Sequence, residues 1–142
     1  MSEVRKVSAS EANELRAAGW TIVDVRTEDE FAAGHAVGAY NVPFLLSVSG
    51  QMVPNPEFSL VFERTFTRDA RLVLSCAAGG RSAKAAAVLE QRGYSSLADL
   101  RGGFNGARDA FGQLTEKGWL AAGLPIEHVS DGRGYAELKR RT

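Results

Sequence analysis

The sequence predicts an α/β fold: an open parallel sheet of about five strands, flanked by helices on both faces. Strand patterns of β-branched and apolar residues alternate along the chain with helical patterns, and this alternation is typical of a parallel sheet covered by helices. The length of 142 residues, with 44% hydrophobic and 24% charged residues, fits one globular domain. A chain of this size buries a core without disulfides or metal.

The first predicted elements are a helix and a buried strand. Ser8 and Glu11 have the spacing of a capping box, so a helix is predicted over residues 8–18. After Gly19, residues 20–25 are β-branched and apolar. Such a run favours a strand that is buried on both faces.

Shorter elements follow up to residue 66. Residues 27–30 form a second capping box and open a short helix that Gly34 ends. Residues 39–42 favour a short strand. Residues 47–55 are predicted to be a loop, and Asn55 as cap with Pro56 in the first turn starts a helix to about Phe66.

The second half continues the alternation. Residues 71–76 predict a buried strand, residues 82–92 a helix and residues 97–100 a brief strand. Two further helices are predicted near 104–111 and 115–122. Residues 1–130 therefore form the predicted single domain, and the glycine-rich, basic segment 131–142 is expected to be a frayed, weakly docked or disordered tail.

Charge and composition exclude several classes of function. Seventeen Lys and Arg side chains balance 17 Asp and Glu, so nothing favours nucleic acid or an anionic membrane. No secretory signal or membrane span is evident. One Cys and two His argue against a disulfide or a metal site. A lone thiol suits a reducing compartment, so we expect a cytoplasmic protein with no metal and no cofactor.

Chemistry concentrates at Cys76, which ends a predicted strand just before two glycines and a helix. Open α/β sheets bind ligands at the carboxyl ends of their strands. A loop that turns from strand to helix can point backbone N–H groups at the sulfur, and the helix N-terminus adds positive charge. Both effects favour the nucleophilic thiolate. The candidate catalytic residue is Cys76, and the candidate substrate-binding loop comprises Ala77, Ala78, Gly79, Gly80, Arg81 and Ser82.

A purely structural role for Cys76 is the alternative, because free Cys is among the most buried residue types. The glycine pair lets the backbone curl around an anion, and Arg81 supplies a cation with a planar fork of donors. The combination of strand, glycines, arginine and helix favours the functional interpretation.

Four segments of the sequence resemble the rhodanese family. Residues 76–82 are similar to its active-site loop, C-x-x-G-x-R-S. Gly102-Gly103-Phe104 resembles the turn after its last strand. The segment with Gly50, Asn55-Pro56 and Phe58 is similar to single-domain members related to plant senescence-associated proteins. The block that is similar to the amino-terminal signature comprises Asp24-Val25-Arg26, Glu30-Phe31, Gly34-His35, Gly38-Ala39 and Asn41-Val42-Pro43.

This resemblance implies a rhodanese-like domain with sulfurtransferase activity. Cys76 would take a sulfane sulfur from thiosulfate or a low-molecular-weight persulfide, become a persulfide, and pass the sulfur to a thiol or cyanide. Inward N–H groups would stabilise the departing anion and the terminal sulfur. The scheme requires no general base, metal or cofactor, and its partners are a small-molecule sulfur donor and a thiol or cyanide acceptor.

Other polar residues receive structural roles. The resemblance implies an ion-pair cluster for Asp24, Arg26 and Glu30. We expect His35 to be a structural hydrogen-bonding group and Lys84 an exposed helix residue. Arg81 is the only charged side chain in the loop, which predicts weak attraction for a dianion such as thiosulfate.

Two other functions compete with this one. Related phosphatases and arsenate reductases also use a Cys loop closed by Arg, but their loop is one residue longer than the six residues from Cys76 to Arg81. The shorter loop suits a single sulfur atom. The second alternative is a sulfur-carrier or redox-sensing module that acts on a protein partner.

Overall fold

The computed structural model describes residues 4–142 and is built around one five-stranded sheet. Its spatial order is β1-β8-β7-β2-β4, and every neighbouring pair is parallel. The predicted open parallel sheet is confirmed. It also contains an unpredicted strand, β1, which is too short at three residues to show a pattern. The strands are β1 (Arg5–Val7), β2 (Thr21–Asp24), β4 (Tyr40–Asn41), β7 (Leu72–Ser75) and β8 (Leu97–Leu100).

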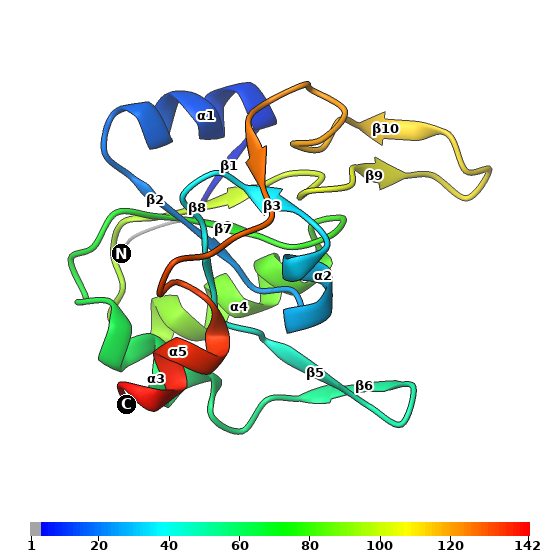
Figure 1. The fold of residues 1–142 in the computed structure, drawn as a ribbon. Helices are drawn as coiled ribbons and strands as arrows, with labels where there is room; N and C mark the ends of the chain where they lie inside the picture. The colour runs from blue at the N-terminus through cyan, green and yellow to red at the C-terminus, as the bar shows by residue number, and fades with distance from the viewer. Residues whose placement is uncertain (1–3) are drawn as a thin grey trace.

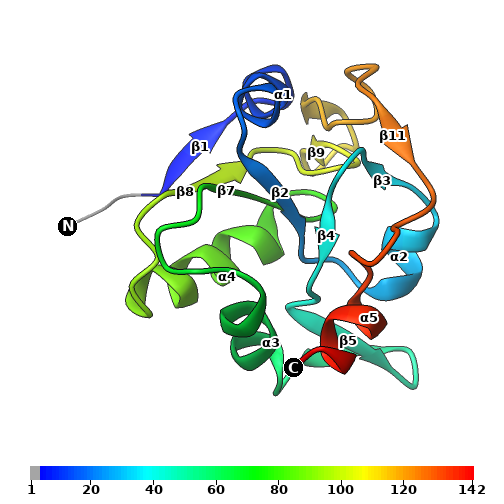
Figure 2. The ribbon, with the colours of Figure 1, turned by 60° about the vertical axis from the view of Figure 1, so that its left-hand side comes forward.

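Helices cover both faces of the sheet, as predicted (Figures 1 and 2). Two helices bury side chains in one hydrophobic cluster: α1 (Ala9–Ala17) and α2 (Glu28–Ala32). Three bury side chains in the other: α3 (Phe58–Thr65), α4 (Gly80–Gln91) and α5 (Tyr135–Arg140). Within residues 4–142, no helix has the length and apolar character needed to cross a membrane.

Side chains along the central strands alternate between these two clusters. Val23 and Leu74 belong to the cluster under α3 and α4, whereas Ile22 and Val73 belong to the cluster under α1. All four are at most 2% exposed. Burial on both faces explains why these strands read as continuous apolar runs rather than as alternating patterns.

Both predicted capping boxes are present. At α1, the Glu11 amide donates to Ser8 Oγ at 3.1 Å and the Ser8 amide donates to Glu11 Oε1 at 2.8 Å. At α2, the same reciprocal bonds join Thr27 and Glu30. Each box satisfies amides that a helix start leaves without partners.

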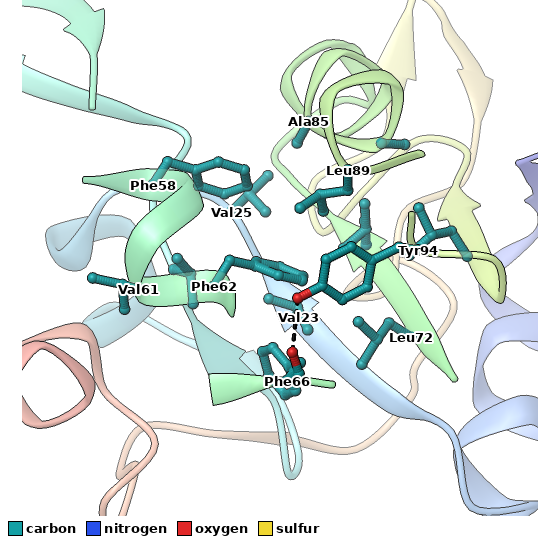
Figure 3. Packing of buried hydrophobic residues seen from close by; sticks show 14 of the residues in the cluster. Val23, Val25, Phe58, Val61, Phe62, Phe66, Leu72, Ala85, Leu89 and Tyr94 are labelled. Atoms are coloured by element: carbon teal, nitrogen blue, oxygen red, sulfur yellow. Dashed lines mark hydrogen bonds between the residues drawn. The ribbon is translucent and has the colours of Figure 1, made fainter. Parts of the chain in front are cut away.

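Aromatic rings fill the space between α3, α4 and the sheet (Figure 3). Phe62 lies edge-on to Tyr94, with ring centroids 5.3 Å apart, and contacts Phe66 at 5.0 Å. The Tyr94 hydroxyl donates to the Phe66 carbonyl at 2.7 Å. Burial raises the pKa of Tyr94, which keeps this donor protonated.

The predicted loop 47–55 is wrong. Strands β5 (Leu45–Val48) and β6 (Gln51–Pro54) pair antiparallel and project from the body of the molecule (Figure 1). Ser49 and Gly50 both have positive φ, at 50° and 79°. Two consecutive residues of this conformation make the tight turn that suits a two-residue hairpin, and the prolines nearby obscured the pattern.

The two helices predicted near 104–111 and 115–122 are also wrong. Two short strands, β9 (Ala107–Arg108) and β10 (Leu114–Glu116), form a hairpin there instead. The backbones of Gly106 and Gly118 meet so closely that a Cβ on Gly118 would lie 2.4 Å from the Gly106 nitrogen. This close crossing of two chain segments overrides the helical spacing of the apolar residues.

The carboxyl-terminal segment differs from the expected loose tail. It contains α5, whose Tyr135 and Leu138 are 4% and 3% exposed and belong to the core under α3 and α4. Asn55 Nδ2 donates to the Tyr135 hydroxyl at 3.0 Å. Asn55 Oδ1 accepts from the Glu57 amide at 3.0 Å, in the turn before the helix. The prediction that α3 starts directly after Asn55 is wrong, because the helix begins at Phe58.

One more pair of strands completes the fold. β3 (His35–Ala36) pairs antiparallel with β11 (Ile126–Glu127), which brings the segment that precedes α5 back beside α2. The preceding residue, Gly34, has a φ of 146°. This pair holds the chain after α2 in place beside the sheet (Figure 2).

Candidate active site

Cys76 lies directly after β7, at the carboxyl end of the sheet, and is 1% exposed. Its Sγ accepts a hydrogen bond from the Gly79 amide at 3.0 Å. Gly79 has a φ of 110°, a left-handed conformation that favours glycine and lets the loop turn back on itself. α4 begins at the next residue, so its unpaired first-turn amides place positive partial charge near the sulfur. A polar donor aimed at Sγ distinguishes Cys76 from an apolar filler.

The Gly102-Gly103 turn supports this loop from behind. The amides of Phe104 and Asn105 donate to the carbonyls of Cys76 and Ala77 at 2.7 and 2.8 Å. A Cβ on Gly103 would lie 2.2 Å from the Cys76 carbonyl oxygen. Only glycine permits this approach, which explains why a glycine pair follows the last strand of the sheet.

Arg81 belongs to the loop, but its side chain binds α2. Its two terminal nitrogens donate to Glu30 of α2, Nη1 to Oε1 at 2.7 Å and Nη2 to Oε2 at 2.9 Å. These bonds lower the pKa of Glu30 to about 2 and raise the pKa of Arg81. The guanidinium therefore ties the loop to α2, and its charge is balanced at the rim of the site rather than free for a substrate.

Asp24 and Arg26 form a buried pair at the end of the neighbouring strand β2. Arg26 Nη2 lies 2.7 Å from Asp24 Oδ2 and donates to the Gly34 carbonyl at 2.8 Å. The guanidinium also stacks over the Phe104 ring, 4.5 Å from its centroid. Because both side chains are about 3% exposed, the pair holds α2 and the Gly102-Gly103 turn against the sheet.

Ser82 connects Cys76 to the last strand of the sheet. Cys76 Sγ lies 3.4 Å from Ser82 Oγ, and Ser82 Oγ donates to Asp99 Oδ1 of β8 at 2.5 Å. The other carboxylate oxygen of Asp99 accepts from Lys6 Nζ at 3.0 Å. A continuous hydrogen-bonded chain thus runs from the sulfur to the edge strand β1.

Comparisons with known proteins agree with this geometry. Residues 8–110 match the rhodanese-like domain family. The chain is 34% identical over 121 residues to thiosulfate sulfurtransferase 16, chloroplastic, of Arabidopsis thaliana, covering 85% of this chain and 91% of that one. The structure resembles that of Rv0390 from Mycobacterium tuberculosis, with a TM-score of 0.75 and 26% identity over 90% of this chain and all of that one.

The chain belongs to the rhodanese-like domain family. A third relative, the senescence-associated protein DIN1 of Raphanus sativus, is 38% identical over 93 residues. The match covers 66% of this chain but only 51% of DIN1. The predicted resemblance to the rhodanese family is therefore confirmed.

The remaining residues of the rhodanese loop form its outer surface. Ala77 is half-buried, whereas Ala78 and Gly80 are exposed. A Cβ on Gly80 would meet no atom within 4 Å, so the space beside it is open. None of these three residues carries a charged side chain. Lys84 is exposed one turn further along α4, as expected.

His35 lies outside the rhodanese loop. Its ring stacks on Phe31 with centroids 3.6 Å apart, and Nδ1 lies 2.7 Å from the Phe31 carbonyl. Nε2 lies 3.2 Å from Glu127 of β11. These contacts join α2 to β11, and hydrogen bonds of this kind are what we expect of a structural residue.

Sequence reasoning missed how two acidic residues contact the loop. Glu30 was assigned to the cap of α2 and to an ion-pair cluster, yet its carboxylate serves the cap and Arg81 together. Asp99 was included in a strand without a role, although it is a charged residue between buried Ala98 and Leu100. Charges this deeply buried need partners, and that rule could have identified Asp99 from the sequence.

Proposed function

We propose that this protein is a sulfurtransferase that carries sulfane sulfur as a persulfide on Cys76. The observation that carries the proposal is the Gly79 amide, which donates to Cys76 Sγ at 3.0 Å at the start of α4. Such a donor stabilises negative charge on sulfur. Relatives named thiosulfate sulfurtransferase support the same activity in general.

The proposed reaction has two displacements. The Cys76 thiolate attacks the outer sulfur of thiosulfate or of a low-molecular-weight persulfide. A new S–S bond forms, the donor's S–S bond breaks, and its electron pair leaves with sulfite or a thiolate. Cyanide or an acceptor thiolate then attacks the terminal sulfur, which releases thiocyanate or a new persulfide and restores the Cys76 thiolate.

Arg81 argues against the phosphatase alternative. A Cys-loop phosphatase needs its arginine to hold the oxyanion, whereas both terminal nitrogens of Arg81 are occupied by Glu30. The length of six residues from Cys76 to Arg81 suits a single sulfur atom better than a tetrahedral oxyanion. These features favour sulfur transfer, and we propose the cytoplasm, where a lone thiol stays reduced, as its setting.

Intact mass spectrometry tests the first half-reaction. The protein is incubated with thiosulfate and, separately, with glutathione persulfide, and its mass is then measured. We expect a gain of one sulfur atom that Cys76→Ser abolishes, since the chain has only this Cys. Thermal unfolding of the variant verifies its fold. Wild-type protein that gains no sulfur from either donor would refute the proposal.

The second half-reaction separates the enzyme from a sulfur carrier. The loaded protein is treated with cyanide or with glutathione, and loss of the added sulfur is followed by mass. Rapid discharge and repeated turnover support the enzyme. A persulfide that persists with both small acceptors supports instead a carrier that delivers only to a protein partner.

A further inference from the structure

The Ser82 hydroxyl has one proton and three polar neighbours. Its oxygen lies 2.5 Å from Asp99 Oδ1, 3.3 Å from the Gly79 carbonyl and 3.4 Å from Cys76 Sγ. A carboxylate that accepts at 2.5 Å forms the strongest of these bonds, because charge-assisted O–H···O⁻ bonds are short and strong. The Ser82 hydroxyl therefore directs its proton at Asp99.

This direction fixes what Ser82 can offer the sulfur. With its proton directed at Asp99, Ser82 Oγ presents only lone pairs to Cys76, so the Cys76 S–H is the donor in that contact. The Gly79 amide approaches the same sulfur as a donor. One neighbour of Sγ thus favours the thiol and the other favours the thiolate.

Asp99 is held in place from the other side by Lys6. The two residues are direct partners in the parallel pairing of β1 and β8, and Lys6 Nζ lies 3.0 Å from Asp99 Oδ2. The Asp99 side chain is 2% exposed, whereas that of Lys6 is 58% exposed. Asp99 is thus a buried carboxylate with one partner toward the active site and one at the surface.

We propose that Asp99 is a positioning residue for Cys76, acting through Ser82. Because Asp99 accepts the hydrogen bond from Ser82, the resting sulfur remains a hydrogen-bond donor toward Ser82 Oγ. The ion pair with Lys6 sets the strength of the bond between Asp99 and Ser82. When the Cys76 proton leaves to solvent or to a base, the hydroxyl can turn from Asp99 to the thiolate while Lys6 retains the carboxylate. The inference rests on the proposed function only in that the thiolate is the nucleophile.

Three further ion pairs lie around the loop. Arg81 and Glu30 bind each other at the rim, and Asp24 and Arg26 do so beneath it. Arg101 and Glu116 form a further pair beyond the Gly102-Gly103 turn. The charged groups on the elements around the loop are Lys6 from β1, Asp24 from β2, Arg26 after β2, Glu30 from α2, Arg81 and exposed Lys84 from α4, Asp99 from β8, Arg101 after β8 and Glu116 from β10.

The test is the pH dependence of Cys76 alkylation by iodoacetamide, followed by intact mass. The chain has a single thiol, so the added mass reports Cys76 alone. We expect Asp99→Asn to move the midpoint of the rate profile to lower pH by about one unit, which is a roughly tenfold faster reaction below the midpoint. Both the lost charge and the released Ser82 proton act in this direction.

Lys6→Met is expected to shift the midpoint of the alkylation profile in the opposite direction. Removing the exposed ammonium leaves Asp99 without its outer partner, so the midpoint moves to higher pH, and the effect shrinks in high salt. Arg5→Met is the matched control, because it removes an exposed cation from the neighbouring position of the same strand. Lys6→Met also keeps the inference testable should Asp99→Asn fail to fold.

A double substitution tests the path through Ser82. In the Ser82→Ala background we expect Asp99→Asn to shift the midpoint by less than half of its effect in the wild type. Equal shifts in both backgrounds would show that Asp99 acts by its charge alone, and unchanged midpoints in Asp99→Asn and Lys6→Met would overturn the inference. Alkylation needs no sulfur donor, so these outcomes are independent of whether Cys76 forms a persulfide.

Discussion

Two arginines that follow neighbouring strands each bind both oxygens of a carboxylate, but in different surroundings. Arg26, after β2, binds Asp24 through Nε and Nη2, whereas Arg81, in the first turn of α4, binds Glu30 through Nη1 and Nη2. The Arg26 pair is 3% exposed on each side, whereas Arg81 and Glu30 are 16% and 32% exposed. The buried pair maintains the fold, whereas the more exposed pair borders the active site.

The contrast follows from what each guanidinium has left to bind. Arg26 also donates to the Gly34 carbonyl and covers the Phe104 ring, so its donors are directed at the protein interior. Arg81 is bound to Glu30 at the rim, where solvent screens the attraction. We therefore expect the buried pair to stay fixed and the rim pair to adjust as a substrate enters or leaves.

Arg26→Met gives the largest expected effect. Removing the guanidinium leaves Asp24 buried without its counter-charge, which costs about 3–5 kcal/mol of folding free energy. In a chain of this size we expect the melting temperature to fall by roughly 10 °C or more. Urea and thermal denaturation measure the loss.

A double variant separates lost pairing from lost packing. Asp24→Asn added to Arg26→Met removes the uncompensated charge, so part of the stability should return. If Arg26→Met unfolds like the wild type, the buried pair contributes little, and the contrast between the two arginines disappears.

Arg81→Lys is expected to act on turnover more than on stability. A lysine ammonium cannot span both oxygens of Glu30, so the loop loses a planar brace. We expect kcat/KM for sulfur transfer to fall at least tenfold, about 1.4 kcal/mol of transition-state stabilisation. The unfolding free energy should change by no more than about 1 kcal/mol. A full rate in the Lys variant would show that Arg81 contributes only charge or nothing.

The sheet and the loop could be predicted because they depend on local signals. The apolar, β-branched runs around Val23 and Val73 predict buried strands. Cys76 lies close to a glycine pair that predicts a tight turn. The Gly106 region could not be predicted in this way. Its structure depends on contact with Gly118 across the β9–β10 hairpin, and such a close approach of two backbones leaves no periodic pattern in the sequence.

The role of Glu30 was hidden for a different reason. Its spacing from Thr27 predicts a capping box, and the structure contains that box. Because the cap alone explains a Glu at this position, the sequence gives no sign of a second partner. The second partner, Arg81, lies 51 residues away and is brought near only by the pairing of β2 with β7. Long-range polar partners follow from topology rather than from local sequence.

Glu30→Gln sharpens the comparison through pH. The pKa of Glu30 is about 2 in the folded protein, against an ordinary value of 4.5. A carboxylate with a lowered pKa stabilises the fold fully above pH 4.5, and this contribution disappears as pH falls toward 2. Because the pair is partly exposed, we expect about 1 kcal/mol at neutral pH rather than the value the full shift implies.

Urea denaturation of wild type and Glu30→Gln at several pH values measures this contribution. The difference in unfolding free energy should be constant near neutrality and should vanish between pH 4.5 and about 2. A difference that stays unchanged through this range would mean that the carboxylate charge does not stabilise the rim, and that the substitution acts through packing alone.

The smallest expected effect concerns the choice of sulfur donor. Glu30 balances the charge of Arg81, so a dianion such as thiosulfate finds only backbone N–H donors in the loop. The neighbouring side chains, half-buried Ala77 and exposed Ala78, carry no charge. At an effective dielectric of about 20 to 80, a cation roughly 6 Å from one donor charge contributes about 0.7–2.8 kcal/mol before screening. We therefore expect Ala77→Arg to lower the KM for thiosulfate several-fold, more at low than at high ionic strength. The KM for a bulky, less charged persulfide should change little.

Ala87→Arg, at an exposed position further along α4, adds the same charge away from the loop and should leave both KM values unchanged. A wild-type protein with a low KM for thiosulfate that Ala77→Arg does not alter would show that backbone donors alone capture the dianion, and that the balanced charge of Arg81 does not limit donor choice.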